Sequence, residues 1–389
     1  MGTAVAPGKD YAALEGWRGV CACLVALHHF RAVFHVSVNA HVSDWRVVRN
    51  AYLFVDFFFV LSGFVIAASY QERLIGRLIS LRAFLLLRLG RLYPLHLFTL
   101  GVMLVLEVFF RYGTSGAVKL ALPPGEASTA AFAANVLLVH GLHTLSMLTW
   151  NHPSWSISTE FATYVAFALL WTTLRKRTWI ASALVIVVAP AAILVLHGDI
   201  NVTYDWGFLR SLLGFALGVT VYNFRRRPEA ATLLQRLTGS EATILESLVV
   251  AASCAFVVLT GDSIYSVAGP FLFAGVVLVF SEARGALGAA LSSWPMRTLG
   301  RLSYSIYLLH YPLQQVLIYV AVLAGSLGWT WLFQLSTVSG GTNVVIGRTP
   351  WVGDAANLLM LATLVAASAA TYRRLEAPSR SYVRQRVIR

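Results

Sequence analysis

Long apolar runs separated by short polar or charged segments make up most of the chain. A helix needs about 20 apolar residues to cross the hydrocarbon core of a bilayer. Ten segments come close to that length. The pattern therefore predicts an all-α integral membrane protein with one membrane-embedded domain over 1–389 and transmembrane helices at roughly 19–36, 51–69, 92–110, 153–174, 178–197, 206–224, 242–260, 264–281, 303–323 and 355–372.

An eleventh apolar stretch, at 128–149, is interrupted by Asn135, His140, Gly141 and His143. We expect a re-entrant or interfacial helix here. A full crossing would place the basic cluster at 175–177 on the outer side and would break the alternation of charge described next.

Composition and charge agree with a membrane location. The chain is 58% hydrophobic and 12% charged, whereas soluble domains are roughly 25% charged. With a cytoplasmic N-terminus, 23 of the 30 Lys and Arg residues fall in inner segments and five in outer loops. The positive-inside rule then places both termini in the cytoplasm. The net charge of +13 is explained by this topology, and we do not expect nucleic acid binding.

The three cysteines, Cys21, Cys23 and Cys254, lie in apolar runs. This placement predicts neither a disulfide framework nor a zinc site, because a zinc site needs clustered Cys and His ligands. We expect no metal.

Titratable residues inside the spans are candidates for function, because charge in lipid is costly. Arg18 and His29 are 11 residues apart in the first span. At 100° and 1.5 Å per residue, they share one helix face about 16 Å apart. His28 points away from that face. Asp56, Glu160 and His310 lie inside later spans.

Several charged and titratable residues can be interpreted either structurally or functionally. His29 and Asp56 are the right residue types for hydrogen bonds to neighbouring helices, and Arg18 for snorkelling to lipid phosphate. Glu160 suits proton transfer or orientation of His29. Arg88 and Arg91 suit lipid headgroups or an anionic cofactor on the cytoplasmic side.

Five stretches resemble, in order, the acyltransferase family 3 membrane proteins. They are YAALEGWRGVCACLVALHH at 11–29, VDFFFVLSGFVI at 55–66, RLGRLYPLH at 88–96, NHPSWSISTEF at 151–161 and LGRLSYSIYLLHYP at 299–312. Arg18 and His29 match the family's Arg-x10-His spacing. Glu15 and Trp17 depart from the pattern, which usually has Asp and Leu there.

The resemblance implies a membrane-bound O-acyltransferase of a bacterial-type inner (plasma) membrane. The donor would be acetyl-CoA or another acyl-CoA, and the acceptor a hydroxyl of a glycan, glycolipid or small molecule. His29 would act as general base or acyl carrier, with Glu160 holding its tautomer. The donor's nucleotide end would bind at Arg18, Arg88 and Arg91.

Further site residues follow from the same hypothesis. Ser303, Tyr304 and His310 are candidates for contacts with the donor, and Asp56, Asn151, His152, Trp155 and Ser156 for contacts with the acceptor. Trp155 suits stacking on a sugar ring or a place in an interfacial aromatic belt. Loops at 37–50, 111–152 and 324–354 would border the acceptor entrance, the last being Gly-rich and expected to be flexible.

Two other functions fit parts of the pattern. A bundle with His, Asp and Glu inside the membrane suits a proton-coupled or small-solute transporter, although no paired halves with interrupted helices are visible. A non-catalytic membrane component that binds a glycan is the second. Consumption of an acyl-CoA thioester would separate an enzyme from both.

Overall fold

The computed structural model describes residues 11–33, 36–112, 122–123, 125–237, 239–329, 333–338 and 341–387. Lys9, Lys119 and Arg389, which entered the charge count, lie outside this part of the chain. A helix occupies each predicted span: α1 (Ala12–Phe30), α4 (Phe54–Ile66), α6 (Leu81–Tyr112), α8 (Trp155–Thr173), α9 (Thr178–Leu196), α10 (Gly207–Arg225), α12 (Gly239–Thr260), α13 (Gly269–Phe280), α15 (Trp294–Ser326) and α16 (Pro350–Thr371).

Six helical runs in the described residues are long and apolar enough to cross a bilayer, at 51–75, 81–112, 175–196, 207–225, 239–260 and 350–387. The protein is therefore a multi-pass membrane protein. Helices α1, α8, α13 and α15 fall outside this group. Of these, α1, α8 and α15 carry polar side chains of the site described below. The count of ten crossings stays a prediction.

The first span ends earlier than predicted. Helix α1 stops at Phe30, and the chain then enters two short strands, β1 (Ala32–Val33) and β2 (Val36–Val38). These strands join a hairpin of β3 (Phe333–Val338) and β4 (Gly341–Ile346) in the order β1-β2-β4-β3. β2 and β4 are parallel, with Ser37 opposite Val345. The segment expected to be a flexible loop at 324–354 thus contains a hairpin paired to the end of the first span.

Shorter helices complete the fold. Helices α2 (His41–Asp44) and α3 (Arg46–Arg49) follow the sheet, and α5 (Glu72–Ile75), α11 (Pro228–Arg236) and α14 (Ala286–Leu291) lie in connections. Helix α7 (Thr129–Val136) has eight residues, about 12 Å at 1.5 Å per residue. It is too short to cross a bilayer, and its position relative to the membrane surface stays a prediction.

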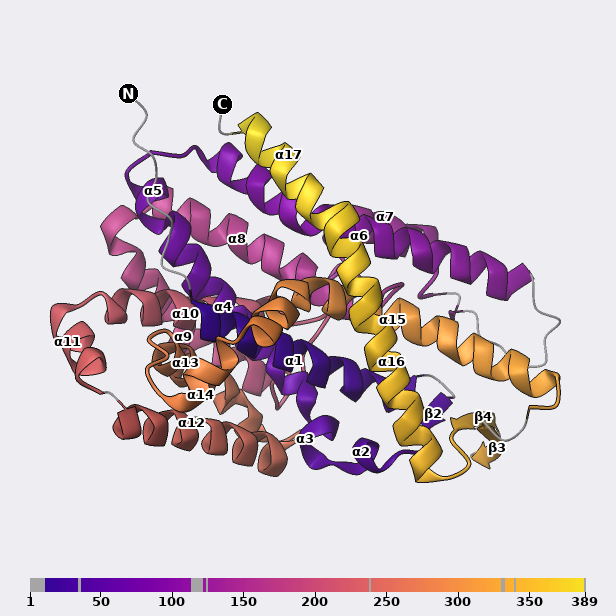
Figure 1. Cartoon of the computed structure of the whole chain (residues 1–389). Helices are drawn as coiled ribbons and strands as arrows, with labels where there is room; N and C mark the ends of the chain where they lie inside the picture. Colours follow the sequence, from indigo (N-terminus) through magenta and orange to yellow (C-terminus); the bar gives the residue numbers. More distant parts are fainter. Residues whose placement is uncertain are drawn as a thin grey trace.

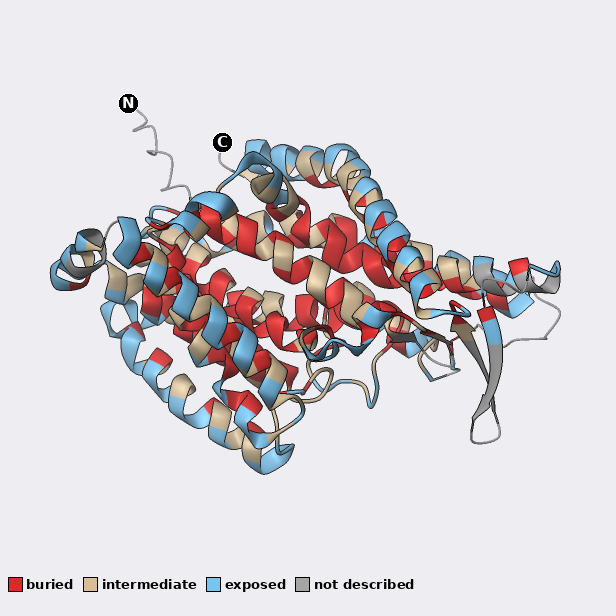
Figure 2. Cartoon of the chain, turned by 60° about the horizontal axis from the view of Figure 1, so that its bottom comes forward, coloured by how far each residue is buried: buried red, intermediate tan, exposed pale blue. Residues whose placement is uncertain are grey.

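Glycines allow close approach of the central helices. A Cβ atom on Gly218 of α10 would lie 2.0 Å from the Val60 carbonyl oxygen of α4, and one on Gly63 would lie 2.2 Å from the Phe215 oxygen. Between α15 and α1, a Cβ on Gly300 would lie 2.0 Å from the Glu15 oxygen. Such small-residue contacts are typical of membrane helix packing. Figure 2 shows buried residues along the central helices and exposed residues along the outer ones.

The predicted inner and outer segments separate in space. At one end, Arg226 pairs with Glu72 at 2.7 Å, and Arg225 pairs with Glu282. At the other end, His41 Nδ1 lies 2.7 Å from Asp354. Figure 1 shows both termini at one end of the molecule and the sheet at the opposite end. This separation is what an alternating topology requires.

We predict that Gly218→Ala lowers the melting temperature of the purified protein, because the Val60 carbonyl leaves no room for a methyl group. Gly275→Ala is the matched control, since nothing lies within 4 Å of a Cβ at Gly275 of α13. It should leave stability unchanged or raise it by about 0.4–1 kcal/mol. Equal melting temperatures for the two variants would contradict the close packing of α4 and α10.

Topology is open to cysteine labelling in a variant that lacks the exposed Cys254. A cysteine at exposed Arg348 should react with an impermeant maleimide added to intact cells or spheroplasts. A cysteine at exposed Arg227 should react only after the membrane is permeabilised. The reverse pattern would overturn the cytoplasmic placement of the termini.

Candidate active site

Two adjoining cavities enter the bundle from the end that holds the termini. The wider one, here the vestibule, has a volume of about 730 Å³. The narrower one, here the chamber, has a volume of about 80 Å³. Arg18, Leu61, Val65, Arg91 and Tyr304 line both cavities. A path therefore runs from the end with the termini into the bundle between α1, α4, α6 and α15.

Six arginines line the vestibule: Arg18, Arg91, Arg225, Arg226, Arg301 and Arg380. Two of them have carboxylate partners, since Arg225 pairs with Glu282 and Arg226 with Glu72. The hydrogen bond to Glu72 raises the pKa of Arg226, so this guanidinium stays charged. Arg18, Arg91 and Arg380 form no ion pair with any residue that the structure describes.

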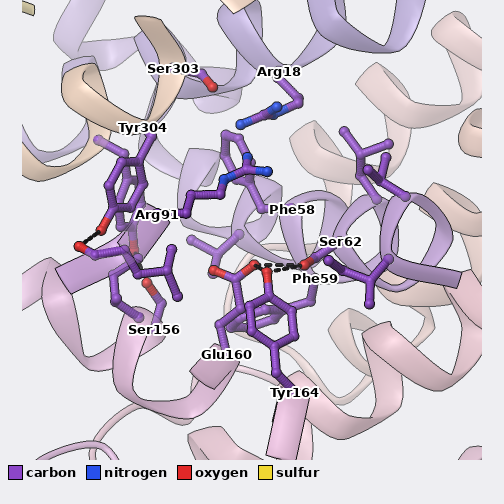
Figure 3. A pocket seen from close by; sticks show the side chains of 17 residues that line it. Arg18, Phe58, Phe59, Ser62, Arg91, Ser156, Glu160, Tyr164, Ser303 and Tyr304 are labelled. Atoms are coloured by element: carbon purple, nitrogen blue, oxygen red, sulfur yellow. Dashed lines mark hydrogen bonds between the residues drawn. The ribbon is translucent and has the colours of Figure 1, made fainter. Parts of the chain in front are cut away.

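A carboxylate cluster lies in the chamber. The Ser62 hydroxyl donates to Glu160 Oε1 at 2.6 Å, and the Tyr164 hydroxyl donates to the same oxygen. Ser62 and Tyr164 also hydrogen-bond each other at 2.8 Å. Figure 3 shows Arg18 and Arg91 pointing into the cavity across from this cluster. A carboxylate held by two hydroxyls and facing two cations is suited to acid–base chemistry.

The rest of the chamber is lined by hydroxyls and aromatic rings. Tyr304 donates to the Leu92 carbonyl at 2.6 Å. Ser156 Oγ lies 2.8 Å from the Tyr307 hydroxyl. Ser303 also lines the chamber, and its buried hydroxyl has no partner among the described residues. An unpaired buried hydroxyl costs free energy, so Ser303 is ready to bind a polar group that enters the chamber.

His29 lies beyond the wall of the chamber and lines neither cavity. Its ring centroid is 4.6 Å from that of His310. His310 is in turn 5.8 Å from Tyr307, which lines the chamber. His310 is fully buried, and both its ring nitrogens lack a partner among the described residues. His29 is thus reached from the chamber across Tyr307 and His310.

The tautomer of His29 is set locally. Its Nδ1 donates to the Val25 carbonyl at 2.9 Å, so the lone pair is on Nε2 and is suited to a general base. The prediction that Glu160 holds this tautomer is wrong in this structure, because Glu160 bonds to Ser62 and Tyr164 instead. His28 points elsewhere, with Nδ1 3.2 Å from the Val48 carbonyl.

Asp56 is paired inside the bundle. Its two oxygens accept from Arg210 Nε at 2.8 Å and Nη2 at 2.9 Å, and both side chains are at most 1% exposed. Arg210 also lies 5.7 Å from the Trp155 ring. Trp155 is 6% exposed and lines neither cavity, so its role in stacking on a sugar ring or in an interfacial aromatic belt stays a prediction. Asp56 likewise lines neither cavity. Arg210 is the one charged residue in the predicted span 206–224, and this could have identified it from the sequence as the partner of Asp56.

Three other predicted site residues have partners away from the cavities. The Asn151 amide donates to the Leu308 carbonyl at 3.0 Å. His152 Nε2 lies 2.8 Å from Glu126. Arg88 donates to the Tyr70 hydroxyl at 2.9 Å, and its guanidinium lies over the Tyr70 ring. Of the predicted site residues, the structure brings Arg18, Arg91, Ser156, Glu160, Ser303 and Tyr304 to the cavities.

A family model described as an acyltransferase domain matches residues 11–347. The chain belongs to this acyltransferase family. All five stretches that carried the resemblance fall inside the match, so that prediction is confirmed. Ser62, in the second stretch, and Tyr164, just after the fourth, complete the Glu160 cluster. Sequence reasoning had not singled them out as site residues.

Two curated proteins are similar over part of the chain. "Protein 2 in picA locus" of Rhizobium radiobacter is 29% identical over 48% of this chain and 97% of its own length. "Acyltransferase MdmB" of Streptomyces mycarofaciens is 30% identical over 44% of this chain and 42% of its own length. No solved structure matches the chain. Among the described residues, no group of three or more His, Cys, Asp or Glu side chains is placed to hold a metal ion.

We predict that Arg210→Met destabilises the protein by about 3–5 kcal/mol, because Asp56 is left as an unpaired buried charge. Asp56→Leu combined with Arg210→Met should recover part of this loss. Arg226→Met, which breaks an exposed pair, should cost less than about 1 kcal/mol. Thermal unfolding in detergent measures all three. An equal loss for Arg226→Met and Arg210→Met would contradict the buried role of the Asp56 pair.

Proposed function

We propose that this protein transfers an acyl group, most often acetyl, from cytoplasmic acyl-CoA to a hydroxyl of a glycan, glycolipid or small molecule at a bacterial-type inner membrane. The proposal rests on one observation: the side chains that line the cavities change in chemistry along the path from the vestibule into the chamber. Six arginines surround the vestibule, and hydroxyls, aromatic rings and one carboxylate surround the chamber. The printed name of the similar Streptomyces protein supports acyl transfer.

The two ends of acyl-CoA match the two cavities in chemistry. The nucleotide end of acyl-CoA carries several phosphate charges, which are prohibitively costly to move into an apolar interior. Arginines without carboxylate partners offer these phosphates charge-assisted hydrogen bonds. The pantetheine arm is neutral and narrow, with amides that need hydrogen-bond partners. Ser303 supplies a hydroxyl without a partner along that route.

The reaction joins the acceptor oxygen to the acyl carbon. The acceptor hydroxyl attacks the thioester carbonyl, the carbon–sulfur bond breaks, and the hydroxyl proton goes to a base and then to the departing thiolate. His29 Nε2 is our proposed base, or the group that carries the acyl between the two halves of the reaction. For His29 to act, the thioester or the acceptor has to pass Tyr307, which separates His29 from the chamber.

Glu160 is our second proposed acid–base group. It faces the chamber directly, and Ser62 and Tyr164 fix its orientation. Once Tyr307 has moved and the thioester carbon lies between the two groups, His29 takes the proton of the attacking hydroxyl, and Glu160 is placed to relay that proton to the leaving thiolate. Two groups at two depths allow donor and acceptor to enter from opposite sides of the membrane.

The test is turnover of radiolabelled acetyl-CoA by purified protein in lipid. We expect His29→Ala to lose at least about 100-fold in thioester consumption, the usual scale of general-base catalysis. Glu160→Gln should lose about as much. His28→Ala is the matched control, since its ring turns toward Val48, and it should retain most of the activity.

Equal turnover by wild type, His29→Ala and His28→Ala would remove His29 from the chemistry. Solute flux into liposomes by wild-type protein, without thioester consumption, would favour a transporter instead.

A further inference from the structure

The C-terminal segment forms one wall of the vestibule. Helix α16 continues through a π-helical turn, η6 (Tyr372–Glu376), into α17 (Ala377–Val387). Tyr372, Glu376 and Arg380 from this segment line the vestibule. The segment lies beyond the part of the chain that the family model matches, which ends at residue 347.

A glycine fixes where α17 docks. Val383 packs onto Gly90 of α6, where an added Cβ would lie 2.7 Å from Val383 Cγ2. Gly90 directly precedes Arg91. Arg380 lies three residues before Val383, which is one turn of the helix. The contact at Gly90 therefore brings Arg380 into electrostatic range of Arg91 and Arg18.

The π-helical turn is held from the other side by α15. Ser305 donates to Glu376, which is 4% exposed, and the Thr371 hydroxyl donates to Ser305 at 3.2 Å. A π-helical turn inserts extra backbone into a helix, and such turns are frequent at functional sites. With Gly90 and Ser305 as its two anchors, the segment presents Arg380 to the vestibule from a fixed position.

Arg18, Arg91 and Arg380 face one cavity and form no ion pair within the described residues. Two glutamates, Glu15 and Glu376, line the vestibule beside its six arginines. Because like charges held together repel each other, this excess of positive charge favours a bound anion. Arg18 and Arg91 line both cavities, whereas Arg380 lines only the vestibule. Arg380 is therefore farther from the chamber along the donor's path.

We propose that Arg380 belongs to the donor-binding site and binds the phosphate of acyl-CoA that is farthest from the thioester, the ribose 3′-phosphate. The inference rests on the proposed donor, and it adds the C-terminal helix to the machinery that binds it.

The experiment compares acetyl-CoA with acetyl-dephospho-CoA, which lacks the 3′-phosphate, in wild type, Arg380→Ala and Arg384→Ala. Arg384 is exposed on the same helix and lines neither cavity. With acetyl-CoA, we expect Arg380→Ala to raise KM about 10-fold or more with little change in kcat, as for loss of a charge-assisted hydrogen bond. Arg384→Ala should match wild type. With acetyl-dephospho-CoA, all three proteins should have similar KM values.

Isothermal titration calorimetry of coenzyme A binding, together with the kinetics, distinguishes failure of the Arg380 inference from failure of the proposed donor. Equal affinity in wild type and Arg380→Ala would overturn this inference and leave the proposed donor standing. An equal loss by Arg380→Ala with both donors would overturn the assignment to the 3′-phosphate. No coenzyme A binding by folded wild-type protein would overturn the donor, and this inference with it.

Discussion

The ion pair between Asp56 and Arg210 lies wholly inside the bundle and ties α4 to α10. A single charge at this position would cost several kcal/mol, so the two helices have to stay in register for both charges to be paired. The glycine contacts of Gly63 and Gly218 hold the same two backbones close. Helix α4 then presents Ser62, about one and two-thirds turns beyond Asp56, to the chamber. The position of the Glu160 cluster therefore depends on this pair.

The arginines at the end of the molecule that holds the termini fall into two groups, those with a hydrogen-bonding partner in the protein and those without a carboxylate partner. Arg225 and Arg226 are paired to glutamates and hold the connections between helices together. Arg88 is bound to Tyr70. Arg18, Arg91 and Arg380 have no carboxylate partner among the described residues and face the vestibule. Three of the arginines that carry the predicted topology thus also form a cavity surface that suits an anion.

The two candidate acid–base groups occupy different surroundings. Glu160 lines the chamber, and hydroxyl groups hydrogen-bond to its carboxylate. The ring of His29 is held by a hydrogen bond to a carbonyl of its own helix and lies against buried His310. Tyr307 stands between them, with its hydroxyl bonded to the Pro153 carbonyl at 3.0 Å. An enzyme that receives a charged donor from one side and an acceptor from the other needs such a separation, because an open channel would leak ions. Movement of Tyr307 would be the step that joins the two sides.

The sequence by itself determined the helices, the separation of charge and the family, because apolar length, charge placement and short motifs are local properties. It also selected Arg18, Arg91 and Glu160 for the site. Only the tertiary structure decided that Asp56 pairs with Arg210, 154 residues away, that Arg88 turns aside and that Arg380 enters the vestibule. Helical periodicity tells which residues share a face, but not which helix that face meets. That choice is made by packing between segments distant in the chain, where a glycine such as Gly90 or Gly218 admits its neighbour.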